Sequence, residues 1–287
     1  MIYALFSLFY TPLIVVLLFQ TVLFAIAIYK KNNGIADIGW GIGFIIISAV
    51  ALGCHLEFKV FFEQLPDPVF ILLITLVCIW GLRLSGYLLI RNWNKPEDWR
   101  YAKWREEWKG NFYIRSFFQV FVLQGIIMTV IGYPILLSAV YGAHMREVPQ
   151  TFAAYGLIIC GTLLWLIGFF FQAVGDYQLF VFKKDPANKG KAMRYGVWKY
   201  TRHPNYFGEA CMWWGIFLLS CESAYIPWTI LLGVISPITI TFMLLRVSGV
   251  TMLENKYKGN KDYEDYQKNT SSFIPMRPHP TFPEGEG

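Results

Sequence analysis

The residues best suited to chemistry in this sequence lie in one short polar stretch, KYTRHPNYFGE, from Lys199 to Glu209. Pro204 fits the first turn of a helix because it has no backbone N–H to leave unpaired, so we predict that a helix begins there. Free N–H groups at a helix start, with cations nearby, form a site for an anion. Asn205 and Glu209 are four residues apart and would share one helix face. Their amide and carboxylate can bind the carboxamide and hydroxyl groups of a nucleotide.

The stretch before this motif favours the same chemistry. It begins with Gln172 and Asp176 near the end of an apolar segment and continues into a basic run. The cations of this run and of the motif are Lys183, Lys184, Lys189, Lys191, Arg194, Lys199, Arg202 and, when protonated, His203. A ligand with several phosphates and a polar head would suit such a site, which indicates a nucleotide cofactor that binds from the cytosol. The alternative is a basic loop followed by a capped helix, and the residue types alone leave both interpretations open.

Polar groups also lie in or beside the apolar segments of the first third of the chain. Arg83, Tyr87 and Arg91 follow one another at four-residue spacing and form a polar stripe on an otherwise apolar helix. An ionisable residue inside such a segment indicates a functional site, although an ion pair that fixes helix packing is the competing interpretation. Asp37 either caps a helix start or acts as an active-site acid.

Long apolar segments must position these groups. Of the 287 residues 55% are hydrophobic and 15% are charged, with a mean hydropathy of +0.42, whereas soluble domains carry about 25% charged residues. Runs of roughly 20 apolar residues are typical of membrane helices, and so many of them in one chain make buried core helices a poor explanation. The sequence therefore predicts an all-α, polytopic membrane bundle of about seven helices. The predicted spans are 3–29, 38–55, 68–90, 117–141, 151–174, 205–220 and 225–245.

The distribution of Lys and Arg predicts the orientation of the bundle. The segments after spans one, three, five and seven hold most of the cations, whereas the opposite side holds Lys59 and Arg146 only. Since cytoplasmic loops carry the excess of cations, we expect the N-terminus outside and the C-terminus in the cytosol. We expect one domain over 1–287, with a substrate-side half (1–115), a cofactor-binding half (116–275) and a flexible tail (276–287). The expected location is the bacterial inner membrane, as a multi-pass protein.

Two classes of partner are disfavoured by composition. The five Cys form no CxxC pair, and no two of the four His stand three or four residues apart, so we predict no metal site. The net charge of +6 is explained by the orientation of the membrane helices, so we predict no nucleic-acid partner.

Two soluble segments flank the spans on the basic side. Asn92–Arg115 carries four Trp and two Tyr among mixed charges. This composition is typical of an interfacial amphipathic helix, and the segment could also form a lid over a cytosol-facing pocket. Lys261–Pro275 is expected to form a short helix followed by an extended end.

Several motifs resemble one membrane family. GVWKYTRHPNYFGE, together with GDYQLFVFKKDPANKGKAM before it, resembles the proteins that share the steroid 5-alpha-reductase C-terminal domain. The bacterial branch of unassigned function also carries RLSGYL, EDWRY and SGVTMLE, here Arg83–Leu88, Glu97–Tyr101 and Ser248–Glu254. The resemblance covers nearly the whole chain and is most specific from Asp176 to Glu209.

The resemblance implies a seven-helix reductase that takes NADPH from the cytosolic side and passes hydride to an activated C=C bond of a lipid-like enone. It places Asn205 and Glu209 at the nicotinamide, Lys183 and Lys191 at the phosphates, and Tyr87 at the substrate carbonyl. Asp37 and Arg83 are the candidates to assist Tyr87. The predicted cofactor-binding set is Gln172, Asp176, Lys183, Lys191, Arg202, His203, Asn205, Tyr206, Glu209 and Arg246.

Two departures from the family pattern qualify these roles. Steroid reductases carry a Gln-Glu pair before Leu-Pro that grips the substrate ketone. Here the nearest string is Glu63-Gln64-Leu65-Pro66, reversed and predicted to lie on the outer face, so Asp37 is the better candidate acid. Lysines stand where the family has phosphate-binding arginines, which keeps the charge but removes the bidentate fork. The choice between NADPH and NADH is therefore open, as is the choice of a steroid substrate.

Two other function classes stay open at this point. Membrane isoprenylcysteine and phospholipid methyltransferases share a related RHPxY turn but use S-adenosylmethionine, and they tend to end in a Glu-Glu pair where this chain has Glu254 and Asn255. The lysine-rich run favours a phosphorylated cofactor instead. A transporter or lipid-binding bundle would carry charges inside more than one span, and only Arg83 is clearly internal. The substrate class extends to sterol, isoprenoid and fatty acyl enones, and both a monomer and a homo-oligomer are compatible with the sequence.

Overall fold

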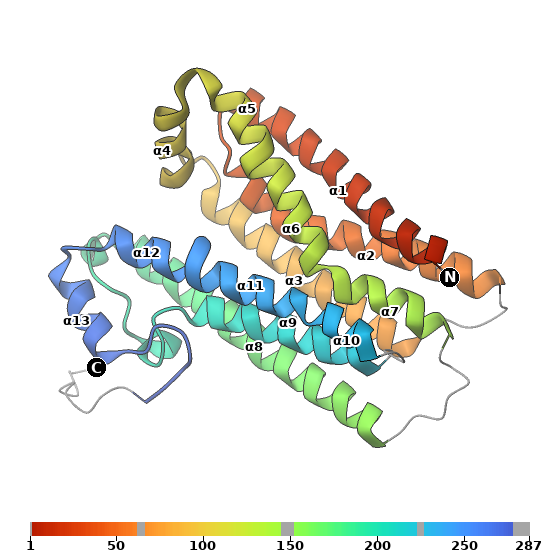
Figure 1. Ribbon diagram of the computed structural model, residues 1–287. Coiled ribbons are helices and arrows are strands. Elements are labelled where there is room, and N and C mark those ends of the chain that lie inside the picture. The colour runs from red at the N-terminus through yellow and green to blue at the C-terminus, as the bar shows by residue number, and fades with distance from the viewer. Residues whose placement is uncertain (1, 62–66, 145–151, 223–226, 278–287) are drawn as a thin grey trace. The chain divides into compact units, whose positions relative to one another are not determined.

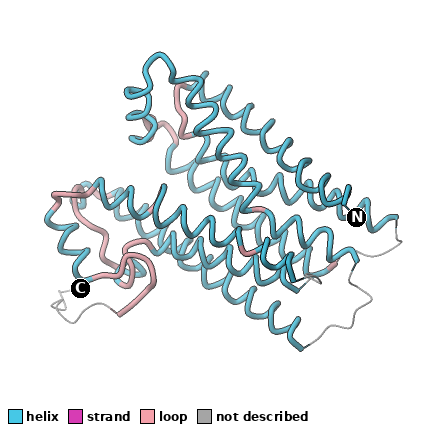
Figure 2. Tube along the Cα trace, viewed as in Figure 1, coloured by secondary structure: helices cyan, strands magenta, loops and turns pink. Residues whose placement is uncertain are grey.

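The computed structural model describes residues 2–61, 67–144, 152–222 and 227–277. Within these ranges every regular element is a helix, drawn in cyan in Figure 2, which confirms the predicted all-α class. Helical segments long and apolar enough to cross a membrane make the chain an integral multi-pass membrane protein. In the described part of the chain these segments are Tyr10–Lys30, Ile35–Leu56, Pro68–Asn92, Trp99–Ile131, Phe152–Lys184 and Ile230–Lys256.

The chain forms two compact units. Unit 1 comprises Met1–Tyr155 and Leu219–Ser236, and unit 2 comprises Gly156–Leu218 and Pro237–Gly287. The longer helices of unit 1 are α1 (Ile2–Lys30), α2 (Ile35–Phe61), α3 (Pro68–Asn92), α4 (Trp99–Trp108), α6 (Leu123–Ile131) and α7 (Tyr133–His144), with the short α5 (Phe112–Ser116) and α10 (Pro227–Gly233). Within this unit α2 packs against α1, α3 and α7.

The start of α3 is fixed by local capping and by one buried histidine. The Asp67 side chain accepts the N–H of Val69 at 3.0 Å, and Pro68 occupies the first turn. His55 Nδ1 lies 2.8 Å from the carbonyl oxygen of Ala139, and Asp67 donates its N–H to His55 Nε2 at 3.3 Å. Both ring nitrogens of this histidine therefore serve the packing of α2, α3 and α7.

The fourth predicted span differs from the observed helix. We expected 117–141, but helical structure runs from Trp99 through a 3₁₀ turn (Lys109–Asn111) and a π-helical stretch (Phe117–Val122) to Ile131, and α7 then begins at Tyr133. The charges of α4 lower the local hydropathy, so an apolar window does not include it. Pro134 in the first turn of α7 cannot continue a preceding helix, which explains the break near Gly132.

Unit 2 is built on two long helices. Its elements are α8 (Phe152–Lys184), most of α9 (Pro204–Glu222), α11 (Ile235–Phe242), a π-helical stretch (Met243–Val247), α12 (Val250–Lys256) and α13 (Lys261–Asn269). Figure 1 shows α12 and α13 at the end of this unit where α8 finishes. The predicted helix start at Pro204 is confirmed. Because Asn205 and Glu209 make its first turns polar, α9 is not among the apolar segments named above, and the number of membrane crossings stays a prediction.

Glycines let α8 and α9 approach closely along an antiparallel seam. A methyl group on Gly215 would lie 2.6 Å from the carbonyl oxygen of Gly161, and one on Gly208 would strike the carbonyl oxygen of Gly168. Such contact of bare backbone surfaces is typical of packed membrane helices. The seam fixes how the polar residues of the two helices face each other.

Gly208→Ala is expected to destabilise the protein by about 1–3 kcal/mol, because the added methyl group meets backbone atoms that cannot move aside. The measurement is the unfolding temperature in detergent. Gly156→Ala, on the partner helix α8, is the matched control, since a methyl group there has no atom within 4 Å in the described structure. Equal unfolding temperatures for the two variants would show that the seam does not determine packing.

Candidate functional site

The predicted polar residues of α8 and α9 meet in two pairs on successive turns. Gln172 Nε2 donates to Glu209 Oε2 at 3.1 Å, and Asn205 Nδ2 donates to Asp176 Oδ1 at 3.1 Å. Three of the four side chains are buried, and Asn205 is half-buried. The arrangement places two carboxylates and two amides next to each other in an apolar part of the protein, where polar groups are costly unless they serve packing or function.

The loop before α9 is positioned against the same turn of α8. The indole Nε1 of Trp198 donates to the carbonyl oxygen of Gly175 at 3.0 Å. A methyl group on Gly175 would lie 3.2 Å from Pro204 Cγ, so glycine at this position allows the first turn of α9 to pack closely against α8. The helix start therefore lies beside Asp176, one residue further along α8.

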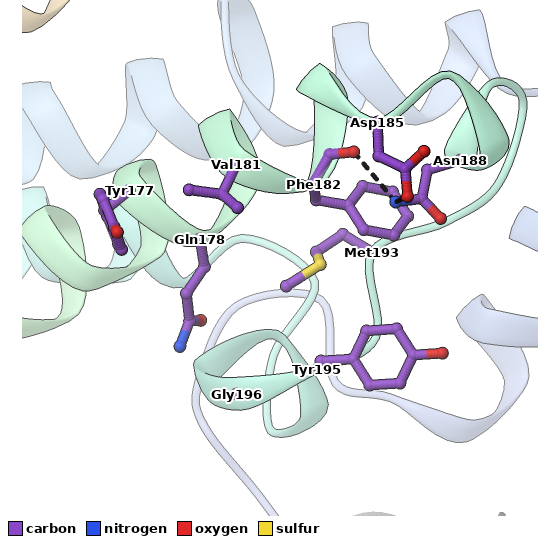
Figure 3. A pocket seen from close by; sticks show the side chains of 9 residues that line it. All are labelled: Tyr177, Gln178, Val181, Phe182, Asp185, Asn188, Met193, Tyr195 and Gly196. Atoms are coloured by element: carbon purple, nitrogen blue, oxygen red, sulfur yellow. Dashed lines mark hydrogen bonds between the residues drawn. The ribbon is translucent and has the colours of Figure 1, made fainter. Parts of the chain in front are cut away.

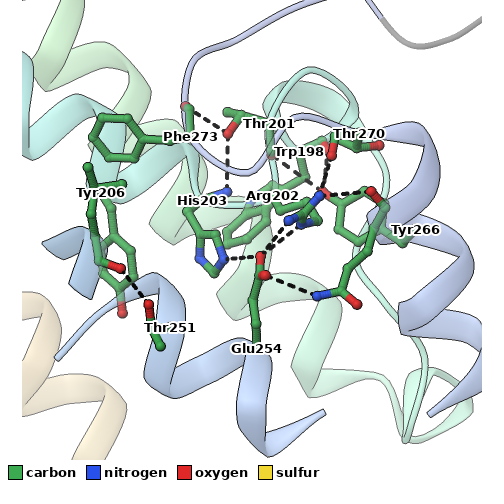
Figure 4. Close-up of polar contacts among 12 residues, drawn as sticks. Trp198, Thr201, Arg202, His203, Tyr206, Thr251, Glu254, Tyr266, Thr270 and Phe273 are labelled. Carbon is green, nitrogen blue, oxygen red and sulfur yellow. Dashed lines mark hydrogen bonds and ion pairs between the residues drawn. The ribbon is translucent and has the colours of Figure 1, made fainter. Parts of the chain in front are cut away.

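Arg202 and His203 converge on one carboxylate, that of Glu254 in α12 (Figure 4). Glu254 Oε1 lies 2.8 Å from both Nε and Nη2 of Arg202 and 3.1 Å from His203 Nε2. Its Oε2 accepts from Gln267 Nε2 at 3.0 Å. One partly buried carboxylate thus accepts hydrogen bonds from four donor atoms that belong to two segments, the loop before α9 and α13. We call this group the Glu254 cluster; its members are Arg202, His203, Glu254 and Gln267.

The remaining donors of Arg202 bind the C-terminal segment. Its Nη1 donates to the carbonyl oxygen of Gln267 at 3.0 Å and to that of Thr270, and its backbone N–H donates to Ser271 at 2.8 Å. The Arg202 side chain is 9% exposed. Its observed partners are protein acceptors, so the geometry favours a structural role for Arg202 over direct contact with a phosphate.

His203 lies flat against Tyr206, with ring centroids 5.4 Å apart and planes at 5°. Burial lowers the pKa of His203 below its usual range, and the hydrogen bond to Glu254 opposes this shift without cancelling it. The imidazole is therefore neutral near pH 7. It acts as a hydrogen-bond donor to Glu254 and adds no positive charge to the helix start.

This lowered pKa predicts how stability depends on pH. The unfolded chain takes up a proton at His203 near pH 6.5, whereas the folded chain resists it until the pH is lower. The contribution of His203 to the free energy of unfolding is fully present above about pH 6.5. It is lost as the pH falls, by at most about 1.4 kcal/mol per pH unit. Between pH 8 and pH 5 the unfolding temperature of His203→Gln should fall less steeply than that of the unmodified protein. If the unfolding temperatures of the two proteins fall with the same slope, groups other than His203 cause the loss of stability in acid.

The C-terminal segment holds the basic loop along its length. Tyr266 Oη donates to the carbonyl oxygen of Trp198 at 2.5 Å, and Thr201 Oγ1 donates to that of Phe273 at 2.9 Å. Nearer α8, Arg194 forms ion pairs with Asp262 at 2.7 Å and Asp265 at 3.1 Å. These contacts, together with the Glu254 cluster, form what we call the C-terminal clamp.

The predicted phosphate-binding lysines lie around this loop. Lys183 is in the last turn of α8 and Lys191 is in the loop, and both side chains are exposed. The neighbours of Lys191 are fixed on each side, because Asn260 Nδ2 donates to the carbonyl oxygen of Gly190 at 2.9 Å and Ala192 donates its N–H to Asp262 at 2.6 Å. Arg246, in the π-helical stretch, is also exposed. All ten predicted cofactor-binding residues belong to unit 2.

The predicted catalytic residues belong to unit 1. Asp37 lies within the first turn of α2, where its carboxylate binds Arg100 Nη2 at 2.5 Å and Tyr101 Oη at 2.7 Å. It therefore ties α4 to α2 and does not cap the helix. The Asn92–Arg115 segment is thus anchored through a buried tyrosine. Glu63 and Gln64 lie outside the described residues.

The polar stripe of α3 is present in the structure. The guanidinium of Arg91 lies 5.5 Å from the centroid of the Tyr87 ring, as expected for residues four apart on one helix face. Arg83 is one turn before Tyr87 on the same helix, and both side chains are partly buried.

Comparison with known proteins identifies the family. A family model described as "Protein of unknown function (DUF1295)" matches residues 23–270. The chain belongs to this family. It is a steroid 5-alpha-reductase-like family, in agreement with the motifs around Asn205 and Glu209.

Two curated relatives show the same kinship. The protein named "3-oxo-5-alpha-steroid 4-dehydrogenase 1" of Rattus norvegicus is 25% identical over 156 residues, covering 54% of this chain and 54% of the relative. The protein of the same name in Mus musculus is 25% identical over 156 residues, covering 54% and 55%. The chain thus matches about half the length of each relative. No solved structure matches the chain.

The sequence did not reveal the carboxylate that binds Arg202 and His203 in unit 2. Glu254 was notable only because no second glutamate follows it, and its partners Arg202 and His203 lie 52 and 51 residues earlier. The sequence carried one signal for this role. Glu254 is an acidic residue that lies after an apolar span and beside a basic segment, and an acidic side chain at such a position can pair with a buried cation.

Proposed function

We propose that the protein is an NADPH-dependent membrane reductase that transfers hydride to the activated C=C bond of a lipophilic enone, of the steroid, isoprenoid or lipid-like kind. The observation that carries this proposal is the double pairing of Gln172 with Glu209 and of Asp176 with Asn205. The names of the two mammalian relatives support the same reaction class. In this proposal unit 2 binds the cofactor from the cytosolic side of a bacterial inner membrane.

The residues present suit such a cofactor. A carboxamide and ribose hydroxyls need donors and acceptors side by side, which the amides and carboxylates of the two pairs supply. Exposed Lys183, Lys191 and Arg246 supply positive charge for phosphates. When bound, the cofactor supplies the hydride. Because lysine lacks the bidentate fork of arginine, we expect only a modest preference for NADPH over NADH.

The protein's own part in the reaction is to orient the substrate and stabilise charge. The role of Tyr87 follows from the family resemblance: its hydroxyl donates a hydrogen bond to the substrate carbonyl and stabilises the negative charge that develops on that oxygen. Arg91 packs against the Tyr87 ring and restricts its position. Arg83 lies one turn from Tyr87 on the same helix, whereas Asp37 binds Arg100 and Tyr101 of α4, so Arg83 is the stronger candidate to assist Tyr87.

The deciding experiment uses the purified full-length protein in detergent. Titration with NADPH, followed by fluorescence, should show saturable binding, and at least one member of a panel of sterol, isoprenoid and fatty acyl enones should cause NADPH oxidation. S-adenosylmethionine should not compete. Binding of S-adenosylmethionine without binding of NADPH would replace the proposal with a membrane methyltransferase, and binding of neither would leave a non-enzymatic bundle.

A further inference from the structure

An apolar stripe runs along the exposed face of α8. Its members recur at intervals of three, four or seven residues, which places them on one side of the helix. They are Ile159, Leu163, Leu166, Phe170, Tyr177 and Val181. In a helix that crosses a membrane, such an exposed apolar stripe faces the acyl chains of lipids.

The stripe leads into a cavity of about 440 Å³ at the last turns of α8 (Figure 3). Tyr177 and Val181 belong to both the stripe and the cavity wall. Phe182 lines it from the helix, and Met193 and Tyr195 line it from the loop that follows. This volume lies within the range of sites that hold small molecules, and the walls are mainly apolar, with exposed tyrosine rings at the edge as in membrane interfaces.

The remaining wall of the cavity is polar. Gln178 and Asn188 contribute amides and Asp185 contributes a carboxylate. Asp185 is exposed, and its Oδ1 accepts the N–H of Ala187 at 2.9 Å. Lys184, the neighbour of Asp185, is exposed and has its ammonium 4.5 Å from the Phe180 ring centroid. Lys184 lies outside the residues that line the cavity, so the cation stands beside the cavity and precedes the lining anion Asp185 by one residue in the chain.

This cavity lies apart from the two amide–carboxylate pairs of the candidate cofactor site. Gln172 and Asp176 point from α8 toward α9. Tyr177 follows Asp176 by one residue, and each residue turns about 100° around a helix. The cavity therefore lies on a different side of α8 from the two amide–carboxylate pairs.

We propose that the cavity binds one glycerophospholipid whose headgroup carries a phosphate and a primary ammonium. The acyl chain lies along the stripe, the ammonium pairs with Asp185 and the phosphate pairs with Lys184. An anionic headgroup would be repelled by the Asp185 carboxylate. A quaternary ammonium has no N–H to donate to it, so this lipid class would also bind more weakly.

The test is native mass spectrometry of the full-length, detergent-solubilised protein, titrated with dioleoyl-phosphatidylethanolamine, -phosphatidylglycerol or -phosphatidylcholine. We expect one phosphatidylethanolamine to bind about tenfold more tightly than either other lipid. Val181→Trp fills the cavity and should weaken this binding about tenfold. Ile238→Trp, at an exposed apolar position on α11 outside both the stripe and the cavity, is the matched control and should leave it unchanged.

Asp185→Asn tests the headgroup and keeps an acceptor for the Ala187 N–H. It should abolish the preference for phosphatidylethanolamine over phosphatidylglycerol, and this result stands even if Val181→Trp fails to fold. Equal affinity of the unmodified protein for the three lipids would reduce the cavity to part of the non-specific lipid shell. Equal lipid binding by Val181→Trp and Ile238→Trp would do the same.

Discussion

Glu209→Ala is expected to weaken NADPH binding about 10- to 100-fold, because a hydrogen bond to a charged group contributes about 1.5–3 kcal/mol. The substitution removes both a buried carboxylate and the acceptor of Gln172 Nε2. Glu209→Gln keeps an acceptor but loses the charge, so its affinity should lie between those of the alanine variant and the unmodified protein. The measurement is a fluorescence titration with NADPH, with the unfolding temperature recorded for each variant.

The matched control for Glu209 is Glu106→Gln, a glutamate that is exposed on α4 in unit 1. It should bind NADPH as the unmodified protein does. A normal affinity in Glu209→Ala, with a normal unfolding temperature, would remove α9 from the cofactor site. A lowered unfolding temperature with normal affinity would make the pair with Gln172 structural.

Glu254→Ala should be the most destabilising single substitution in unit 2. The side chain of Arg202 is 9% exposed, and its guanidinium would lose the carboxylate that lies 2.8 Å from two of its nitrogens. Removing one partner of a buried ion pair costs about 3–5 kcal/mol, because the other charge stays buried. The double variant Arg202→Leu/Glu254→Leu should recover part of this loss, since no buried charge remains. Thermal unfolding of the two variants measures the difference.

A second measurement separates loss of the clamp from general unfolding. Limited proteolysis of Glu254→Ala should cut first in the basic loop between α8 and α9, whose contacts with α13 and the following segment depend on Arg202. Two results would contradict a clamp organised by Glu254. One is equal stability of Glu254→Ala and the double variant, and the other is a first proteolytic cut outside this loop.

Local patterns in the sequence predicted the parts of the site that depend on neighbouring residues. Pro204 set the start of α9, and the four-residue spacing of Asn205 and Glu209 placed both on one helix face. In the structure this face meets α8. The stripe of Arg83, Tyr87 and Arg91 follows from the same helical geometry, and the contact of Arg91 with Tyr87 confirms it.

Contacts between distant residues were beyond the reach of these patterns. Asp37 left two interpretations open because its partners, Arg100 and Tyr101, are 63 and 64 residues away. Arg202 was read as a phosphate ligand because its own neighbours are basic, and only the fold brings Glu254 to it. The basic helix α4 was separated from the fourth span because hydropathy cannot show that a helix continues through charged turns.

The C-terminal clamp also implies an order of events during protein synthesis. Ala192 precedes its partner Asp262 by 70 residues, and Arg202 precedes Glu254 by 52 residues. At about 5–20 residues per second, the ribosome completes these partners roughly 3–14 s after the loop itself. Helices α8 and α9 can enter the membrane during this interval while the loop between them is still open. In the proposed reductase, competence to hold the cofactor is therefore among the last properties that the nascent chain acquires.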